Sequence, residues 1–226
     1  MTLIFDLDGT LLDTLDDLWA SVNHALAHFS LHLRSKCEVR QFLGNGARYL
    51  IHQSLAAPSC ASSAPAEEAF VSPDLEERVL REFQSYYLEH SLDRTRPYPG
   101  IPELLRTCRQ RDYRTAIVSN KPDAAVQELH RRFFADTIDL AIGEQQPAIR
   151  RKPAPDMVLA ALRQLPADDH VFYIGDSEVD IATARNAAIP CIAVSWGFRD
   201  RDFLASQGYA HTIIDTPSAL LPILKG

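Results

Sequence analysis

Six short runs of apolar residues, most of them followed by a helical pattern, set the strongest limit on how this chain can fold. Each run is apolar throughout, which is typical of parallel strands that are covered on both faces. The runs are TLIFD at 2–6, RTAIVS at 114–119, DLAIG at 139–143, VFYIGD at 171–176, CIAVSW at 191–196 and the weaker HTIID at 211–215. Helix-spaced apolar positions lie between them at 122–134, 155–165 and 178–189. Strand and helix in alternation predict an α/β fold with a parallel sheet.

One long stretch interrupts this alternation and contains helical patterns only. The patterns lie at 15–29, 46–57 and 73–90. The stretch closes with RPYPG at 96–100, where two prolines and a glycine stiffen a turn and mark a boundary. We therefore predict a core domain of residues 1–15 and 95–226 and an inserted helical domain of residues 16–94. A segment rich in Ala and Ser at 57–69 is interpreted as a surface loop.

Composition and charge narrow the class of partner. A formal net charge of -7 argues against a protein that binds nucleic acid, because such a protein needs a basic face. The sequence has no apolar run of membrane-spanning length, and its first five residues resemble a strand rather than a signal peptide. The four cysteines form no metal-type pair and are interpreted as reduced thiols. These features predict a cytoplasmic protein without a membrane partner, and no pattern indicates its oligomeric state.

The first predicted strand ends in two aspartates, Asp6 and Asp8, within IFDLDGTLLDT. Residues two positions apart on a strand share one face, so the two carboxylates lie side by side. Ionised carboxylates in such a place repel each other and lose hydration, which a cation or a shared proton must offset. The alternative is a polar strand end that caps a loop.

Two further motifs supply groups suited to binding phosphate. In VSNK, Ser119 and Asn120 follow a strand, and Lys121-Pro122 is expected to open a helix. A hydroxyl and free amides at a helix start suit a phosphate, although a simple N-cap has the same pattern. In RRKPAPD, Lys152 precedes a helix, and its ammonium would neutralise phosphoryl oxygens unless it is only solvated.

A fourth motif, YIGDSEVD, adds two more carboxylates. Asp176 ends an apolar strand, and Asp180 follows it one helical turn later on the same side. Together they form a hard oxygen site suited to Mg²⁺, unless Asp176 is only a capping residue. Because ligands bind beyond the carboxyl ends of parallel strands, Asp6, Ser119 and Asp176 are expected at one edge of the sheet.

In this order the four motifs resemble those of the haloacid dehalogenase superfamily, over almost the whole chain. The resemblance implies a Rossmann-like core with an inserted α-helical cap and, because Asp8 is present, the phosphotransferase branch. It implies that Asp6 is the nucleophile that forms an aspartyl-phosphate and that Asp8 is the general acid and then the base. It also implies Mg²⁺ held by Asp6, the backbone carbonyl of Asp8 and Asp176, with Asp180 in support.

The resemblance extends to the residues that would contact a substrate. Ser119, Asn120 and Lys152 would hold the transferring phosphoryl oxygens, and Thr10 is counted among the substrate-binding residues. The phosphatases of the superfamily resemble this chain at Thr10 more than β-phosphoglucomutase does.

One segment of the insert points to a particular substrate. LGNGARYLIHQSLA, at 43–56, resembles the cap segment of phosphoglycolate phosphatases, with Asn45 and Arg48 in the recurring places. Arg48 could then pair with a substrate carboxylate through two parallel hydrogen bonds, although a solvated arginine at a helix start has the same pattern. The expected substrate is therefore a small phosphorylated metabolite, 2-phosphoglycolate first.

Several alternatives stay open. The same core could serve a β-phosphoglucomutase-like phosphomutase, a pyrophosphatase, or a phosphatase acting on nucleotides or sugar phosphates. A phosphate-binding regulator without turnover is disfavoured, since it needs no acid beside a nucleophile. A zinc site at His24 and His28 is disfavoured because the sequence offers no third ligand nearby.

Overall fold

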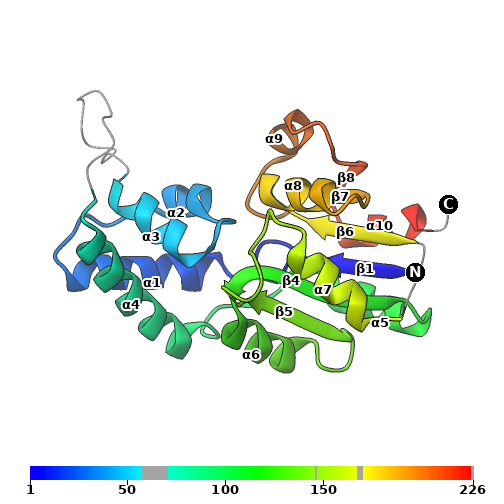
Figure 1. The fold of residues 1–226 in the computed structure, drawn as a ribbon, viewed down its shortest axis with the longest axis horizontal. Coiled ribbons are helices and arrows are strands. Elements are labelled where there is room, and N and C mark those ends of the chain that lie inside the picture. Colours follow the sequence, from blue (N-terminus) through cyan, green and yellow to red (C-terminus); the bar gives the residue numbers. More distant parts are fainter. Residues whose placement is uncertain (57–70, 146, 167–169, 225–226) are drawn as a thin grey trace. The chain divides into compact units, whose positions relative to one another are not determined.

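Two stretches of the chain, Met1–Asp13 and Arg96–Gly226, come together in an α/β unit, and Thr14–Thr95 between them forms a helical unit (Figure 1). The computed structural model describes residues 1–56, 71–145, 147–166 and 170–224. The Ala- and Ser-rich segment 57–69 lies outside the described residues. The segment predicted as an inserted helical domain, 16–94, falls within the helical unit.

The α/β unit is built on a parallel sheet of six strands in the order β5-β4-β1-β6-β7-β8. The strands are β1 (Thr2–Phe5), β4 (Arg114–Pro122), β5 (Leu140–Glu144), β6 (Val171–Gly175), β7 (Cys191–Val194) and β8 (Thr212–Ile214). All six predicted strands are confirmed. Because β1 pairs with both β4 and β6, the sheet extends from it in both directions. In such sheets, ligands bind in the crevice beyond the carboxyl ends of the strands, at the point where the strand order reverses.

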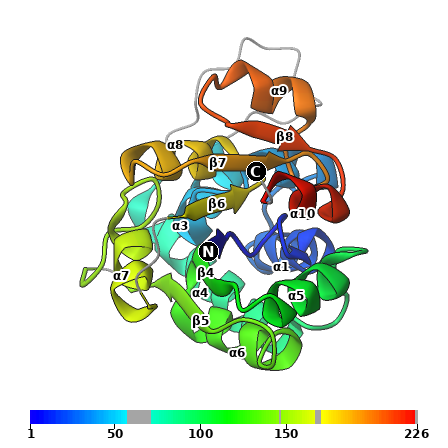
Figure 2. The ribbon, with the colours of Figure 1, turned by 90° about the vertical axis from the view of Figure 1, so that its right-hand side faces the viewer.

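Helices cover both faces of the sheet (Figure 2). One face packs against α5 (Ile101–Gln110), α6 (Asp123–Phe133) and α10 (Leu220–Ile223), and the other against α7 (Asp156–Gln164), α8 (Glu178–Asn186) and α9 (Arg201–Ser206). Along β1, Leu3 and Phe5 enter the first of these cores and Ile4 enters the second, as strand alternation requires. The predicted α6, α7 and α8 are confirmed within a few residues.

Helix spacing of apolar residues also explains the helical unit. Its helices are α1 (Leu15–His28), α2 (Lys36–Phe42), α3 (Gly46–Ala56) and α4 (Pro73–His90). On α1, Leu18, Val22 and Leu26 recur every four residues and are all buried. The three predicted helices are confirmed. The short α2 escaped prediction, although Ser35 and Glu38 form a capping box at its start.

A two-stranded ladder lies where the chain leaves and re-enters the α/β unit. β2 (Leu12–Asp13) pairs antiparallel with β3 (Arg96–Pro97). Strands of two residues carry no readable periodicity, so the ladder was not predicted from the sequence. It holds next to each other the two crossings, which are the points where the chain leaves and re-enters the α/β unit.

Within the helical unit, a buried aspartate fixes the second of these crossings. The Asp17 carboxylate accepts hydrogen bonds from the backbone N–H groups of Arg94 and Thr95, at 3.0 and 2.8 Å, and from the Thr95 hydroxyl at 2.8 Å. Asp17 is only 2% exposed. The start of α1 is therefore tied to the residues that follow α4.

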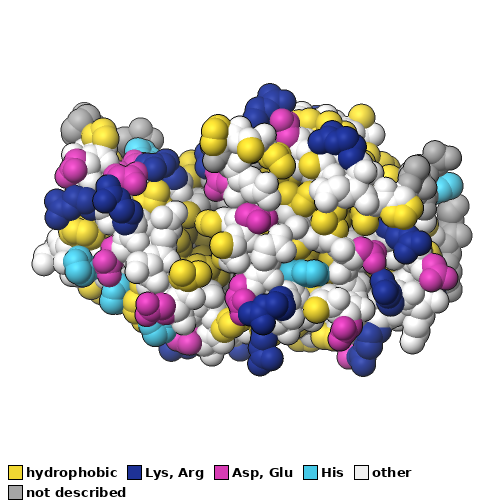
Figure 3. Space-filling view, turned by 60° about the horizontal axis from the view of Figure 1, so that its bottom comes forward, with side chains coloured by type: hydrophobic (Ala, Val, Ile, Leu, Met, Phe, Trp, Pro, Cys, Tyr) yellow, Lys and Arg dark blue, Asp and Glu magenta, His cyan; other side chains and the backbone are white. Residues whose placement is uncertain are grey.

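Three further observations concern membrane-spanning potential, surface charge and thiols. Among the described residues, no helix is long and apolar enough to cross a membrane. On the face in Figure 3, Lys and Arg side chains are interspersed with Asp and Glu. Cys37, Cys108 and Cys191 are free thiols.

Replacing Asp17 by alanine should lower the free energy of unfolding by roughly 2–3 kcal/mol, because a buried N–H group, a part-buried N–H group and a buried hydroxyl lose a charged acceptor. Urea unfolding followed by circular dichroism measures this loss. Asp16→Ala is the matched control, since Asp16 lies on the same helix and makes an exposed ion pair with Lys36. Equal effects of the two substitutions would contradict the structural role given to Asp17.

Candidate active site

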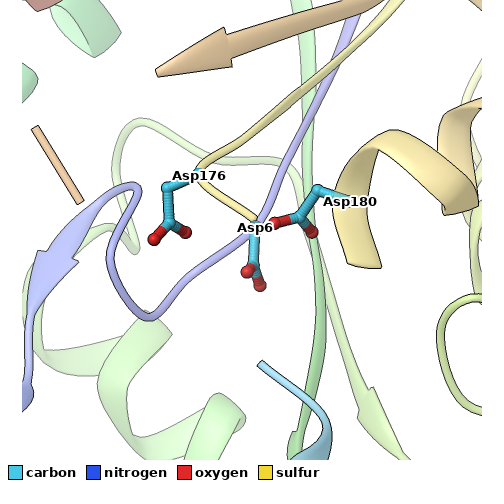
Figure 4. Close-up of side chains that lie close together, drawn as sticks. All are labelled: Asp6, Asp176 and Asp180. Atoms are coloured by element: carbon cyan, nitrogen blue, oxygen red, sulfur yellow. The ribbon is translucent and has the colours of Figure 1, made fainter. Parts of the chain in front are cut away.

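Three buried carboxylates meet at the carboxyl edge of the sheet. Asp6 directly follows β1, Asp176 directly follows β6, and Asp180 lies in the first turn of α8. One oxygen from each lies within 4.8 Å of the others, and Asp176 and Asp180 are completely buried. Figure 4 shows the three side chains gathered from these segments. The expectation that Asp6 and Asp176 share one edge of the sheet is confirmed.

A buried lysine is inserted between two of these carboxylates. Lys152 Nζ lies 2.8 Å from Asp6 Oδ1 and 2.7 Å from Asp180 Oδ1, and its side chain is 2% exposed. The backbone of Lys152 is fixed in turn, because its N–H donates to Asn120 Oδ1 at 2.7 Å and its carbonyl accepts from Asn120 Nδ2 at 3.0 Å. Asn120 of β4 therefore holds Lys152, which lies in the loop before α7.

The carboxylate of Asp6 is held in one orientation. Its Oδ1 accepts from Lys152 and from the N–H of Leu7 at 2.7 Å, which leaves Oδ2 without a hydrogen bond to the described residues. Burial and the charge of Asp180 raise the pKa of Asp6 to about 7, against the opposing effect of Lys152. Burial and the charges of Asp180 and Asp6 raise the pKa of Asp176 well above its usual range. The site therefore holds more negative charge than the protein alone neutralises.

Asp176 and Asp180 have different surroundings. Asp176 accepts one hydrogen bond at each oxygen, from the Thr10 hydroxyl at 3.0 Å and from the N–H of Phe198 at 2.6 Å. Asp180 Oδ1 accepts from Lys152 and, at 3.0 Å, from the Tyr173 hydroxyl. The Oδ2 atom of Asp180 closes the capping box of α8 with Ser177. Asp180 thus joins the site to the helix start, whereas Thr10 orients Asp176.

Gly9 permits the close approach of the first loop to Asp176. Its φ of 83° lies in the left-handed region, and a Cβ at this position would come within 2.3 Å of Asp176 Oδ2. Any other residue would meet both backbone strain and a steric clash. The glycine of DLDGT is therefore required by the position of Asp176, a residue remote in the sequence.

Asp8 has a partner that the sequence did not suggest. Lys121 Nζ lies 2.9 Å from both carboxylate oxygens of Asp8, and the exposed fractions of the two side chains are 4% and 18%. The expected helix does follow Lys121-Pro122, since Pro122 is the N-cap of α6, but β4 also continues to Pro122 and pairs there with Glu144 of β5. Ser119 and Asn120 accordingly lie on a strand, both buried. The available signal was a lysine directly after Ser-Asn at the end of a strand.

The two residues predicted from the insert belong to the helical unit. Asn45 directly precedes α3, and Arg48 lies in its first turn. The Arg48 guanidinium is bound by two carboxylates of α4, with Nη1 at 3.1 Å from Glu76 and Nη2 at 2.6 Å from Glu77. The Arg48 side chain is 54% exposed. A substrate carboxylate would have to compete with these acidic partners.

The residues present fit a hard divalent cation. When all three carboxyls are ionised, they and the one ammonium leave two uncompensated negative charges, an excess that the raised pKa values of Asp6 and Asp176 reflect. Oxygen ligands alone, without Cys or His, are what Mg²⁺ prefers. Among the described residues, this is the one group of His, Cys, Asp or Glu side chains close enough to hold a metal. His24 instead pairs with Glu82 and stacks on Tyr86.

Comparisons with known proteins agree with this geometry. Residues 3–194 match the family described as haloacid dehalogenase-like hydrolase. The chain belongs to this family. Phosphoglycolate phosphatases of Pasteurella multocida and Mesorhizobium japonicum are 35% and 34% identical to it, over 98% and 88% of this chain and 96% and 84% of their own.

Solved structures of the family have the same fold. A crystal structure from Lactobacillus delbrueckii subsp. bulgaricus is 39% identical, with a TM-score of 0.87 over 97% of this chain and 95% of that one. A predicted phosphoglycolate phosphatase from Haemophilus somnus is 28% identical, with a TM-score of 0.85 over 99% and 97%. This chain is therefore a hydrolase of the phosphoric monoester class, as its phosphoglycolate phosphatase relatives are.

Mg²⁺ should raise the unfolding temperature of the chelator-treated protein, because it binds the folded site and not the unfolded chain. At a concentration a hundredfold above Kd, the gain is about 2.7 kcal/mol. Calorimetry with and without Mg²⁺ measures it, and Asp176→Asn should remove most of the shift.

The exposed Asp136 provides the control. Asp136→Asn should respond to Mg²⁺ as the unmodified protein does. A full Mg²⁺ response in Asp176→Asn would show that the cation binds elsewhere.

Proposed function

We propose that this chain is a Mg²⁺-dependent phosphatase that works through an aspartyl-phosphate on Asp6 and hydrolyses 2-phosphoglycolate to glycolate and phosphate. The observation that carries the proposal is the Asp6 carboxylate, held by Lys152 at a strand end with Asp8 two residues away. A carboxylate and an acid or base placed in this way form the minimal machinery for a two-step phosphoryl transfer.

In the first step Asp6 attacks phosphorus, and the bond from phosphorus to the leaving alkoxide breaks. Asp8 gives its proton to that alkoxide, so that the alcohol departs neutral. Lys152 neutralises charge on the transferring phosphoryl oxygens, which Ser119 and Asn120 are also proposed to hold. Most of this catalysis is positioning and electrostatic stabilisation, as phosphoryl transfer requires.

In the second step water attacks the phosphorus of the aspartyl-phosphate. Asp8, now a carboxylate, takes a proton from that water, and Asp6 leaves as a free carboxylate. Mg²⁺, held by Asp6, the backbone carbonyl of Asp8 and Asp176 with support from Asp180, would supply positive charge for the phosphoryl group in both steps. The excess of buried carboxyl groups over ammonium groups at the site supports this assignment.

The substrate is proposed from two observations. Relatives that align with nearly the whole chain are phosphoglycolate phosphatases. The helical unit, proposed to act as a cap, carries Arg48 after the Gly44–Gly46 turn, where a guanidinium can bind a carboxylate. Asn45 of the same turn is proposed to contact the substrate.

Turnover of a panel of phosphorylated metabolites by the purified protein with Mg²⁺ tests the substrate. 2-Phosphoglycolate should have the highest kcat/KM. A preference for pyrophosphate, a nucleotide or a sugar phosphate would overturn the substrate assignment while leaving the phosphatase chemistry. Conversion of one sugar phosphate into its isomer would identify a mutase.

Asp6→Asn should abolish turnover and leave the fold intact, because an amide cannot form the acyl phosphate. Release of inorganic phosphate measures turnover, and circular dichroism checks the fold. The matched control is Asp13→Asn, which changes an aspartate of the β2 ladder with no part in the site. More than trace activity in Asp6→Asn would identify another nucleophile.

Arg48→Ala should lower kcat/KM for 2-phosphoglycolate about ten- to a hundredfold, because a charge-assisted contact contributes about 1.5–3 kcal/mol. It should change kcat/KM for 4-nitrophenyl phosphate little, since that substrate has no carboxylate. Arg81→Ala is the matched control, because Arg81 also pairs with Glu77 and is largely exposed.

The role of Arg48 follows from comparing the losses of kcat/KM for 2-phosphoglycolate and for 4-nitrophenyl phosphate. Equal losses on both substrates would mean that Arg48 only holds α3 against α4 through Glu76 and Glu77. A loss confined to 2-phosphoglycolate would assign it to the substrate carboxylate.

A further inference from the structure

We propose that Lys121 is a positioning residue for Asp8: its ammonium, bonded to both oxygens of the Asp8 carboxylate, fixes the orientation from which Asp8 exchanges protons with the leaving group and with water. The inference rests on the proposed function. It assigns a role to a residue that the four motifs leave without one, and its tests are separable from those of the phosphatase itself.

The geometry of the pair is specific. Lys121 Nζ is equidistant from the two Asp8 oxygens, at 2.9 Å from each. An ammonium equidistant from both oxygens fixes the direction in which the carboxylate points, because turning the carboxylate away would lengthen at least one of the two contacts. The lysine side chain is 4% exposed, so water screens this contact little.

The base of the lysine is rigid. Lys121 lies on β4, and the next residue, Pro122, pairs with Glu144 of β5. Gly143 of β5 comes so close that a Cβ there would be 2.8 Å from the carbonyl oxygen of Lys121. The N–H of Lys121 donates to Ser119 Oγ at 3.3 Å. A side chain on such a strand holds its partner more accurately than one on a loop.

The site thus contains two buried lysines with different partners. Lys152 contacts Asp6 and Asp180, and Lys121 contacts Asp8. Loss of Lys152 is expected to impair attack on every substrate, because it acts at the nucleophile. Loss of Lys121 should impair only those steps in which Asp8 moves a proton.

Leaving-group dependence separates these cases. Departure of a weakly basic aryl oxide needs no acid, whereas departure of an alkoxide does. For Lys121→Met, kcat/KM for 4-nitrophenyl phosphate should stay within about threefold of the unmodified protein. For the alkyl phosphate that the unmodified protein hydrolyses best, kcat/KM should fall about a hundredfold, as expected for a catalytic group misplaced by about 1 Å.

The second half-reaction gives an independent readout. Hydrolysis of the aspartyl-phosphate needs Asp8 as a base with any substrate. Lys121→Met should therefore release a burst of 4-nitrophenolate, one equivalent per enzyme, followed by a steady-state kcat about a hundredfold below that of the unmodified protein. Lys121→Arg, which keeps two donors toward the carboxylate, should recover part of that kcat.

A double-mutant cycle that combines Lys121→Met with Asp8→Asn completes the test. Lys36→Met is the control for the loss of a lysine, since Lys36 pairs with Asp16 in the helical unit. Once Asp8 is changed, removing Lys121 should cost little more. Additive losses, or equal losses on aryl and alkyl phosphates without a burst, would overturn the inference and make Lys121 a substrate ligand or a structural residue. An unmodified protein that hydrolyses no phosphomonoester would instead overturn the proposed function.

Discussion

The Lys152 ammonium, buried between the carboxylates of Asp6 and Asp180, is the contact on which the rest of the site depends. Without it, the three buried carboxylates would lose the ammonium that lies between Asp6 and Asp180. Removing one partner from such a buried pair typically costs about 3–5 kcal/mol, because the remaining charge stays buried and unpaired. The same contact also orients Asp6 and connects it, through Asp180, to the start of α8.

Lys152 is itself part of a wider set of contacts between loops. Asn120 binds the backbone of Lys152 at both its N–H and its carbonyl, which connects the end of β4 to the loop before α7. Thr10 donates to Asp176, which connects the loop after β1 to the end of β6. Each loop of the site is therefore fixed by a side chain from another strand end. Such mutual fixing keeps the groups in place before a substrate arrives, which phosphoryl transfer requires.

Most of the fold could be predicted because its strands and longer helices carry their own pattern. Runs such as VFYIGD at 171–176 are apolar on both faces, and helices such as α4 repeat their buried residues at helical spacing. The elements that were not predicted from the sequence are short. The two-residue strands β2 and β3 form only because the chain crosses between units there, a long-range event that leaves no local signal.

The sequence by itself determined which ionisable groups follow the strands: the positions of Asp6 and Asp176 after apolar runs were sufficient to predict that they meet at one edge of a parallel sheet. The tertiary structure decided which charge meets which. Lys152 pairs with Asp6 and Asp180. Lys121 pairs with Asp8, from which it is separated by more than a hundred residues of sequence. The tertiary structure also bound Arg48 to two glutamates of α4. The reason is physical: strand ends are set by local pattern, whereas ion pairs depend on side-chain directions that only the packed chain fixes.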